Sequence, residues 1–106
     1  MKKMAMTYFY DIMRPPQMFD INIHESGTKA IAFFKENCQK YFHQPVQLRA
    51  NLSIPTVGQV TIGVGLRQMV ARFLTEEEAE IYKVYGEKSL INFKTMELEA
   101  PEEGKQ

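Results

Sequence analysis

The sequence is poor in cysteine, with a single residue, Cys38, among 106. One thiol excludes an intramolecular disulfide, and it excludes the thiolate clusters that hold zinc or iron–sulfur centres. The chain must therefore fold on its apolar residues, which make up 44% of the sequence. A domain of this length can bury roughly 65% of its unfolded surface. We expect a reducing, cytoplasmic location and no cofactor.

Long hydrophobic runs are also missing. No stretch approaches the roughly 18 apolar residues of a membrane span. The apolar residues that follow Lys2 and Lys3 stop too soon for a signal peptide. We therefore expect no association with a membrane.

Neither sign of charge is in excess, because 13 basic residues balance 13 acidic ones. This balance argues against a protein that works mainly by coating nucleic acid. The distribution is uneven, however: residues 1–72 hold nine basic and four acidic side chains, and the remainder is correspondingly acidic. Two interpretations stay open, an acidic part that folds beside the basic part or a molecule with one basic face.

Recognisable catalytic motifs are absent as well. Cys38 has Phe34 and Phe42 at i−4 and i+4, which is the setting of a core cysteine and not of an activated thiol. The two histidines, His24 and His43, stand at opposite ends of one predicted helix, too far apart to share a metal. We expect no metal site and no catalysis. One catalytic alternative remains, a small enzyme or ligand carrier that uses His24 with Asp20 and Tyr10 in a cleft.

Alternating apolar residues over 6–12 and 19–23 predict two antiparallel strands, joined by a stiff connector at 14–17 with paired prolines. Ser26 is a predicted N-cap for a helix that ends before Pro45. Its apolar stripe contains Ile31, Phe34, Cys38, Tyr41 and Phe42.

Two further alternating runs, 46–54 and 60–66, predict a β-hairpin with Ile54 opposite Val60. Residues 66–74 fit a strand or a helix, and we favour the strand. Thr75 and Glu78 form a predicted capping box for a second helix that stops at Gly86. Residues 90–98 favour a last strand that closes the sheet.

These elements predict an α+β fold in the order ββαβββαβ, a small antiparallel sheet of five to six strands packed against two helices. We expect a single domain over residues 1–98. The acidic residues 99–106 are predicted to be a disordered tail, because they offer nothing apolar to dock.

Two surface features are candidate binding sites. The predicted hairpin gives a polar face, able to bind phosphates or an acidic partner, that contains Gln47, Arg49, Asn51, Arg67 and Arg72. On the first helix, Phe33 lies far from the apolar stripe and is predicted to point outward. Exposed aromatics are preferred interface anchors, so we expect partner binding through Phe33, Lys29, Asn37 and Lys40.

The outward aromatic and the lack of catalytic motifs together favour a small protein-binding module. We expect it to act as a regulator or inhibitor of a larger complex, of the kind that phages and mobile elements encode, and self-association is a further possibility. The alternative is a nucleic-acid-binding protein that uses the basic hairpin face.

Overall fold

The computed structural model describes residues 3–12, 17–92 and 95–101. They form two compact units, divided between Phe73 and Leu74, a division that the sequence did not predict. In this part of the chain, none of the helices is long and apolar enough to cross a membrane.

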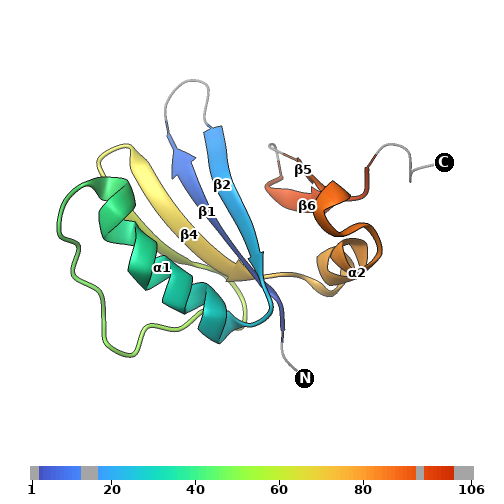
Figure 1. Cartoon of the computed structure of the whole chain (residues 1–106), viewed down its shortest axis with the longest axis horizontal. Helices are drawn as coiled ribbons and strands as arrows, with labels where there is room; N and C mark the ends of the chain where they lie inside the picture. The colour runs from blue at the N-terminus through green and yellow to red at the C-terminus, as the bar shows by residue number, and fades with distance from the viewer. Residues whose placement is uncertain (1–2, 13–16, 93–94, 102–106) are drawn as a thin grey trace. The chain divides into compact units, whose positions relative to one another are not determined.

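The first unit is built on a four-stranded antiparallel sheet (Figure 1). Its strands follow the order β2-β1-β4-β3 across the sheet. Their bounds are Ala5–Asp11 for β1, Gln17–His24 for β2, Val60–Val64 for β3 and Arg67–Phe73 for β4. The predicted antiparallel pair at the start of the chain is thus confirmed, and so is the strand interpretation of residues 66–74. Most of the connector between β1 and β2, residues 13–16, lies outside the described residues.

One edge strand of this sheet, β2, is irregular. Its pairing with β1 shifts so that two residues, Asp20 and Ile21, stand opposite Tyr8 alone. Asp20 has φ 49°, a left-handed conformation that Asp tolerates better than most residues. Such a β-bulge bends an edge strand and interrupts its outer row of hydrogen-bonding groups.

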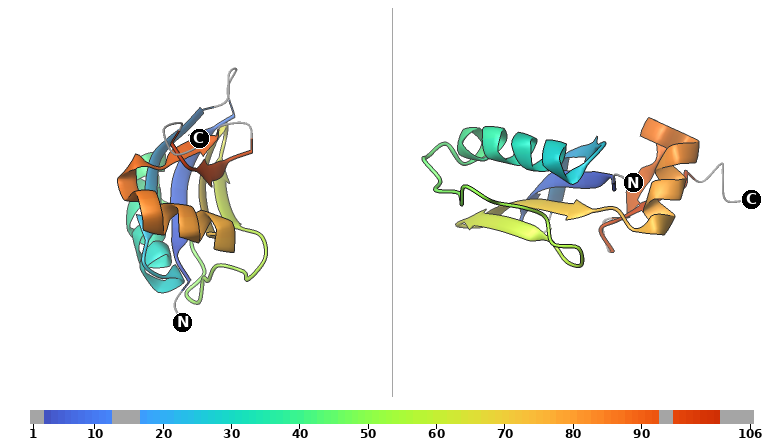
Figure 2. Two further views of the ribbon diagram at one scale, coloured as in Figure 1. Left: turned by 90° about the vertical axis from the view of Figure 1, so that its right-hand side faces the viewer. Right: turned by 90° about the horizontal axis from the view of Figure 1, so that it is seen from below.

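Helix α1, Gly27–Phe42, covers one face of the sheet, as the right-hand view in Figure 2 shows. Ser26 Oγ accepts the N-terminal capping hydrogen bond from Lys29 N, as predicted, and the helix ends at His43 in a left-handed conformation. The predicted apolar stripe is confirmed as the buried side of α1. It packs on a sheet face that includes Ala5, Phe9, Met69 and Ala71.

The predicted strand over residues 46–54 is wrong, and with it the register that set Ile54 opposite Val60. This segment is irregular. Its alternating apolar residues, Val46, Leu48, Leu52 and Ile54, pack against the core without joining the sheet. The hairpin partner of β3 is β4, and the turn between them is Gly65-Leu66. Gly65 has φ 62°, which suits the first central position of a tight hairpin turn.

The second unit contains α2 (Glu76–Tyr85), the short 3-10 helix η1 (Gly86–Lys88) and the strands β5 (Leu90–Asn92) and β6 (Glu97–Glu99). The capping box of Thr75 and Glu78 is confirmed. The last predicted strand does not close the large sheet, because β5 and β6 form a separate two-stranded sheet. Glu99, the first residue of the predicted tail, lies in β6, and residues 102–106 lie outside the described part of the chain. The chain is an α+β protein, as predicted.

Candidate functional site

A groove of about 760 Å³ lies between the first half of α1 and the irregular segment that precedes β3. It is contained in the first unit. Its walls come from the start of α1, from residues 52–56 and from the end of β4. Lys3, just before β1, completes the lining.

Five of the residues that line the groove are apolar, and we refer to them as its floor. Ile31 and Ala32 contribute from α1, Leu52 and Ile54 from the irregular segment, and Phe73 from β4. Gly27 is what allows the helix to start so close to the sheet. A Cβ atom at Gly27 would lie 2.9 Å from the Phe73 ring, closer than carbon atoms normally approach. A side chain at this position would therefore displace Phe73 from the floor.

The charged residues that line the groove are both lysines. Lys3 Nζ lies 5.9 Å from the centroid of the Phe73 ring, within the range of a cation–π contact. Lys35 Nζ donates a 3.1 Å hydrogen bond to the Ala50 carbonyl and so ties α1 to the irregular segment. Among the described residues, the side chains that line the groove include no Asp or Glu.

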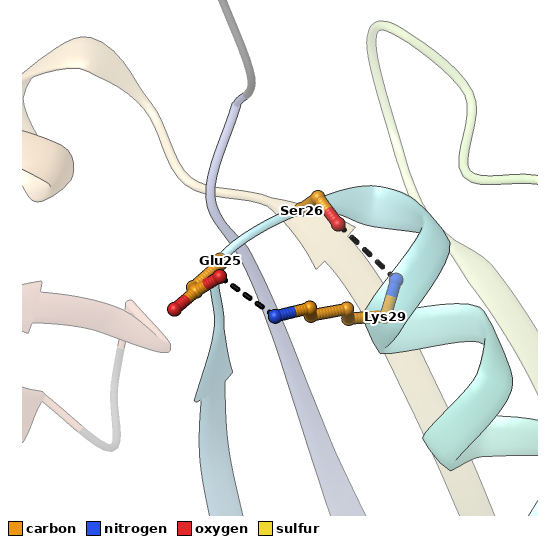
Figure 3. Close-up of polar contacts among 3 residues, drawn as sticks. All are labelled: Glu25, Ser26 and Lys29. Atoms are coloured by element: carbon orange, nitrogen blue, oxygen red, sulfur yellow. Dashed lines mark hydrogen bonds and ion pairs between the residues drawn. The ribbon is translucent and has the colours of Figure 1, made fainter.

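The start of α1 adds to this positive character. The first turn of the helix holds no acidic residue, so the partial positive charge of its N-terminus is not neutralised there. The carboxylate just before it, Glu25, is 2.7 Å from Lys29 Nζ (Figure 3). Four residues with hydroxyl side chains also line the groove, namely Ser26, Thr28, Ser53 and Thr56. Together these groups suit an anionic ligand that has an apolar part.

The predicted partner-binding surface on α1 lies apart from this groove. Phe33 does not point freely outward as predicted: it is half-buried, and its ring lies 5.1 Å from that of His24. Helical periodicity describes α1 alone, whereas β2 extends far enough to cover this side of the helix. Asn37 Nδ2 donates to the Phe33 carbonyl at 2.9 Å, Lys29 pairs with Glu25, and Lys40 is exposed in the last turn.

The predicted polar hairpin face is not one face of a sheet, because Gln47, Arg49 and Asn51 belong to the irregular segment. Arg67 Nε lies 3.5 Å from Asp11 Oδ1, and its guanidinium lies 5.7 Å from the Tyr41 ring centroid. Arg72 Nη1 donates to the Phe73 carbonyl at 3.0 Å. Two arginines of this set are thus held by contacts within the protein.

His24 and Tyr10, two of the three residues of the catalytic alternative, do not converge. His24 is paired with Ala5 in the sheet, whereas Tyr10 lies five residues further along β1, roughly 17 Å away at 3.3 Å per residue. His24 shares a 2.8 Å hydrogen bond with the buried Thr7 hydroxyl. Desolvation by burial lowers the pKa of His24. The contacts of this histidine are thus those of a packed strand residue.

Cys38 is fully buried, as predicted, and its Sγ lies 3.8 Å from the Lys35 carbonyl. Burial raises the pKa of the thiol. Among the described residues, no group of His, Cys, Asp and Glu side chains is arranged to hold a metal ion.

Sequence reasoning missed the residues that define the groove. Lys3, Lys35, Ser53 and Thr56 have no shared motif or spacing, and only the path of the irregular segment brings them together. Comparison of the chain with models of protein families, with characterised proteins and with solved structures finds no match.

Proposed function

We propose that the chain is a small protein-binding module whose groove takes up an acidic, partly apolar segment of a larger partner. The observation that carries this proposal is the composition of the groove lining, whose described residues combine two lysines and no acid with a floor of five apolar residues.

The apolar floor has to supply most of the affinity. Carboxylates near exposed lysines contribute little each, about 0–1 kcal/mol, because water screens them. A carboxylate at a helix N-terminus adds a similar amount, about 0.3–1 kcal/mol. Burying a Leu or Phe side chain contributes more, about 1.5–3 kcal/mol. The best ligand is therefore a segment with apolar side chains on the floor and carboxylates beside Lys3 and Lys35.

This arrangement favours a protein segment over nucleic acid, the main alternative. Nucleic-acid binding depends on many phosphate contacts along a basic track. Among the described residues that line the groove, only Lys3 and Lys35 carry positive charge, and two lysines do not form such a track. A phosphate backbone offers no apolar group that could pack on the apolar floor.

We infer further that the module works in the cytoplasm as a regulator or inhibitor of a larger complex. The buried, unpaired Cys38 supports a reducing location. The groove offers room for one short segment, which suits a protein that occupies a recognition element of its partner.

The proposal is tested by affinity capture from nuclease-treated lysate with the full chain and two variants. Ala32→Glu places a negative charge in the groove at an exposed position of α1. Gln39→Glu makes the same change of charge on the same helix, at an exposed residue that does not line the groove. We expect one stoichiometric protein to be captured by the wild type and by Gln39→Glu and to be lost with Ala32→Glu.

Equal capture by all three proteins would contradict a role for the groove. The nucleic-acid alternative would instead be supported if nucleic acid is captured when nuclease is omitted. This capture should disappear at high salt and should be unaffected by Ala32→Glu.

A further inference from the structure

The two edges of the large sheet differ in a way that bears on assembly. Edge strands expose unpaired backbone groups, and monomeric proteins usually protect them with bulges, charges or prolines. β2 has such protection, since its bulge places the exposed Asp20 on the edge. β3, Val-Thr-Ile-Gly-Val, has neither charge nor proline, and its register with β4 is regular at all five residues.

The outward backbone groups of β3 belong to Thr61 and Gly63. Leu66 O accepts a hydrogen bond from Ile12 N, so Leu66 bonds toward β1. Because bonding direction alternates along an antiparallel strand, Arg67, Met69 and Ala71 bond toward β3. Their partners there are Val64, Ile62 and Val60. Thr61 and Gly63, which are both exposed, therefore direct their N–H and C=O groups away from the sheet.

This edge is complementary to itself. We propose that two copies of the chain pair through antiparallel β3 strands, related by a twofold axis at Ile62. This register sets Thr61 opposite Gly63 of the second copy and forms two hydrogen-bonded pairs. Thr61 meets a glycine, so no side chains collide there.

The same register matches the remaining side chains. Ile62 meets its own counterpart, and Val60 meets Val64 of the other copy, all on the face that packs against the core. No charged residue of β3 enters the contact. The twofold axis then matches apolar with apolar at every position of that face.

Two exposed apolar residues lie just beyond the ends of β3. Val57 precedes the strand and is 90% exposed, and Leu66 follows it and is 59% exposed. Twofold pairing about Ile62 brings the Leu66 end of one copy alongside the Val57 end of the other. Both residues are thereby drawn toward the same contact, where burial of their apolar surface is favourable. A second copy of the chain offers this match at both ends of the contact. No feature of the chain calls instead for a strand of an unrelated protein.

The test is sedimentation velocity of the full chain over a concentration series. We expect a monomer–dimer equilibrium. Gly63→Lys should raise the dimer dissociation constant more than about tenfold, because it places a charge at the strand contact. A Cβ at Gly63 meets its nearest neighbours at 3.6 and 3.8 Å, so the monomer accommodates the change. Gly63→Ala is the matched control and should still dimerise.

Cross-linking tests the register directly and does not depend on the lysine variant. Under mild oxidation, Ile62→Cys should form a disulfide-linked dimer because residue 62 opposes itself. Thr61→Cys should not, because residue 61 opposes residue 63. Circular dichroism establishes that each variant folds.

A monomer at every concentration, or a dimer that Gly63→Lys leaves intact, would overturn the proposal. The proposal would also be overturned if the wild type is a monomer and Gly63→Lys fails to capture a protein that the wild type captures. That result would assign the edge to a strand of another protein. The proposed function does not depend on the outcome, because the groove variants lie on α1.

Discussion

Glu78 Oε2 accepts a 2.8 Å hydrogen bond from Leu98 N and so joins α2 to β6 across 20 residues of sequence. The other carboxylate oxygen, Oε1, accepts a 3.0 Å bond from Thr75 N at the start of the same helix. Glu78 is only 2% exposed. A buried carboxylate is tolerated when its oxygens are hydrogen-bonded, and both oxygens of Glu78 meet that condition.

Glu78→Ala should therefore destabilise the second unit. Loss of the carboxylate leaves two backbone N–H groups without their acceptor, at a cost of about 2–4 kcal/mol. Urea unfolding followed by circular dichroism, with amide exchange of α2, measures the effect. Glu80→Ala, at an exposed residue of the same helix, is the control and should change stability by less than about 0.5 kcal/mol. Equal effects of the two variants would contradict the role assigned to Glu78.

The Cys38 thiol should be unreactive in the folded protein. It is fully buried, and burial raises its pKa, so little thiolate forms near neutral pH. We expect a thiol reagent to label native protein only at the rate of unfolding, and to label it completely in denaturant. Rapid stoichiometric labelling of the native chain would show that the thiol is accessible after all.

Protonation of His24 should weaken the first unit. Its pKa is lowered in the folded state by desolvation, so the unfolded chain takes up the proton at a higher pH than the folded one. Stability should therefore be constant above the unfolded pKa, about 6.5, and should fall as pH drops below that value. Urea unfolding at a series of pH values measures the slope, which should be smaller in His24→Gln. An identical slope in both proteins would assign the pH dependence to other groups.

The elements that could be predicted from sequence are those that local chemistry determines. Ser26 and the Thr75–Glu78 capping box define helix starts through bonds to the nearest backbone. The apolar stripe of α1 identifies its buried side because helical periodicity and burial coincide there. The alternation of β1 and β2 predicted a pair that the structure has.

The hairpin prediction was wrong because alternation of apolar and polar residues indicates that one side of a segment is buried. It does not indicate that the segment pairs with a strand. Leu52 and Ile54 pack in the core from the irregular segment, which belongs to neither sheet. The turn that does form a hairpin, Gly65-Leu66, carries the signal of a glycine at the first central position. In the sequence this glycine competes with the longer alternating pattern of residues 46–54, which favours a different partner for β3.

The groove could not be predicted because it depends on where an irregular segment runs. Lys35 contacts Ala50 across 15 residues through a backbone carbonyl, which any residue type supplies. The environment of Phe33 likewise depends on how far β2 extends past α1. Contacts of this kind leave no spacing or motif in the sequence.

The central claim, that the groove binds an acidic segment, predicts a specific effect of charge reversal. Lys35→Glu should weaken binding of the captured partner by about tenfold or more, since it sets like charges together. Lys40→Glu makes the same change at an exposed residue in the last turn of α1, outside the groove. Isothermal titration of the wild type and both variants with the partner measures the difference.

The most direct measurement is chemical-shift mapping of the ¹⁵N-labelled chain during titration with the captured partner segment. We expect the largest shifts at the groove, at Thr28, Ala32, Ser53 and Thr56, and we expect Ala32→Glu to abolish them. Shifts confined to Phe33, Asn37 and Lys40, or to Arg49 and Asn51, would contradict this expectation and would assign binding to one of the surfaces predicted from sequence.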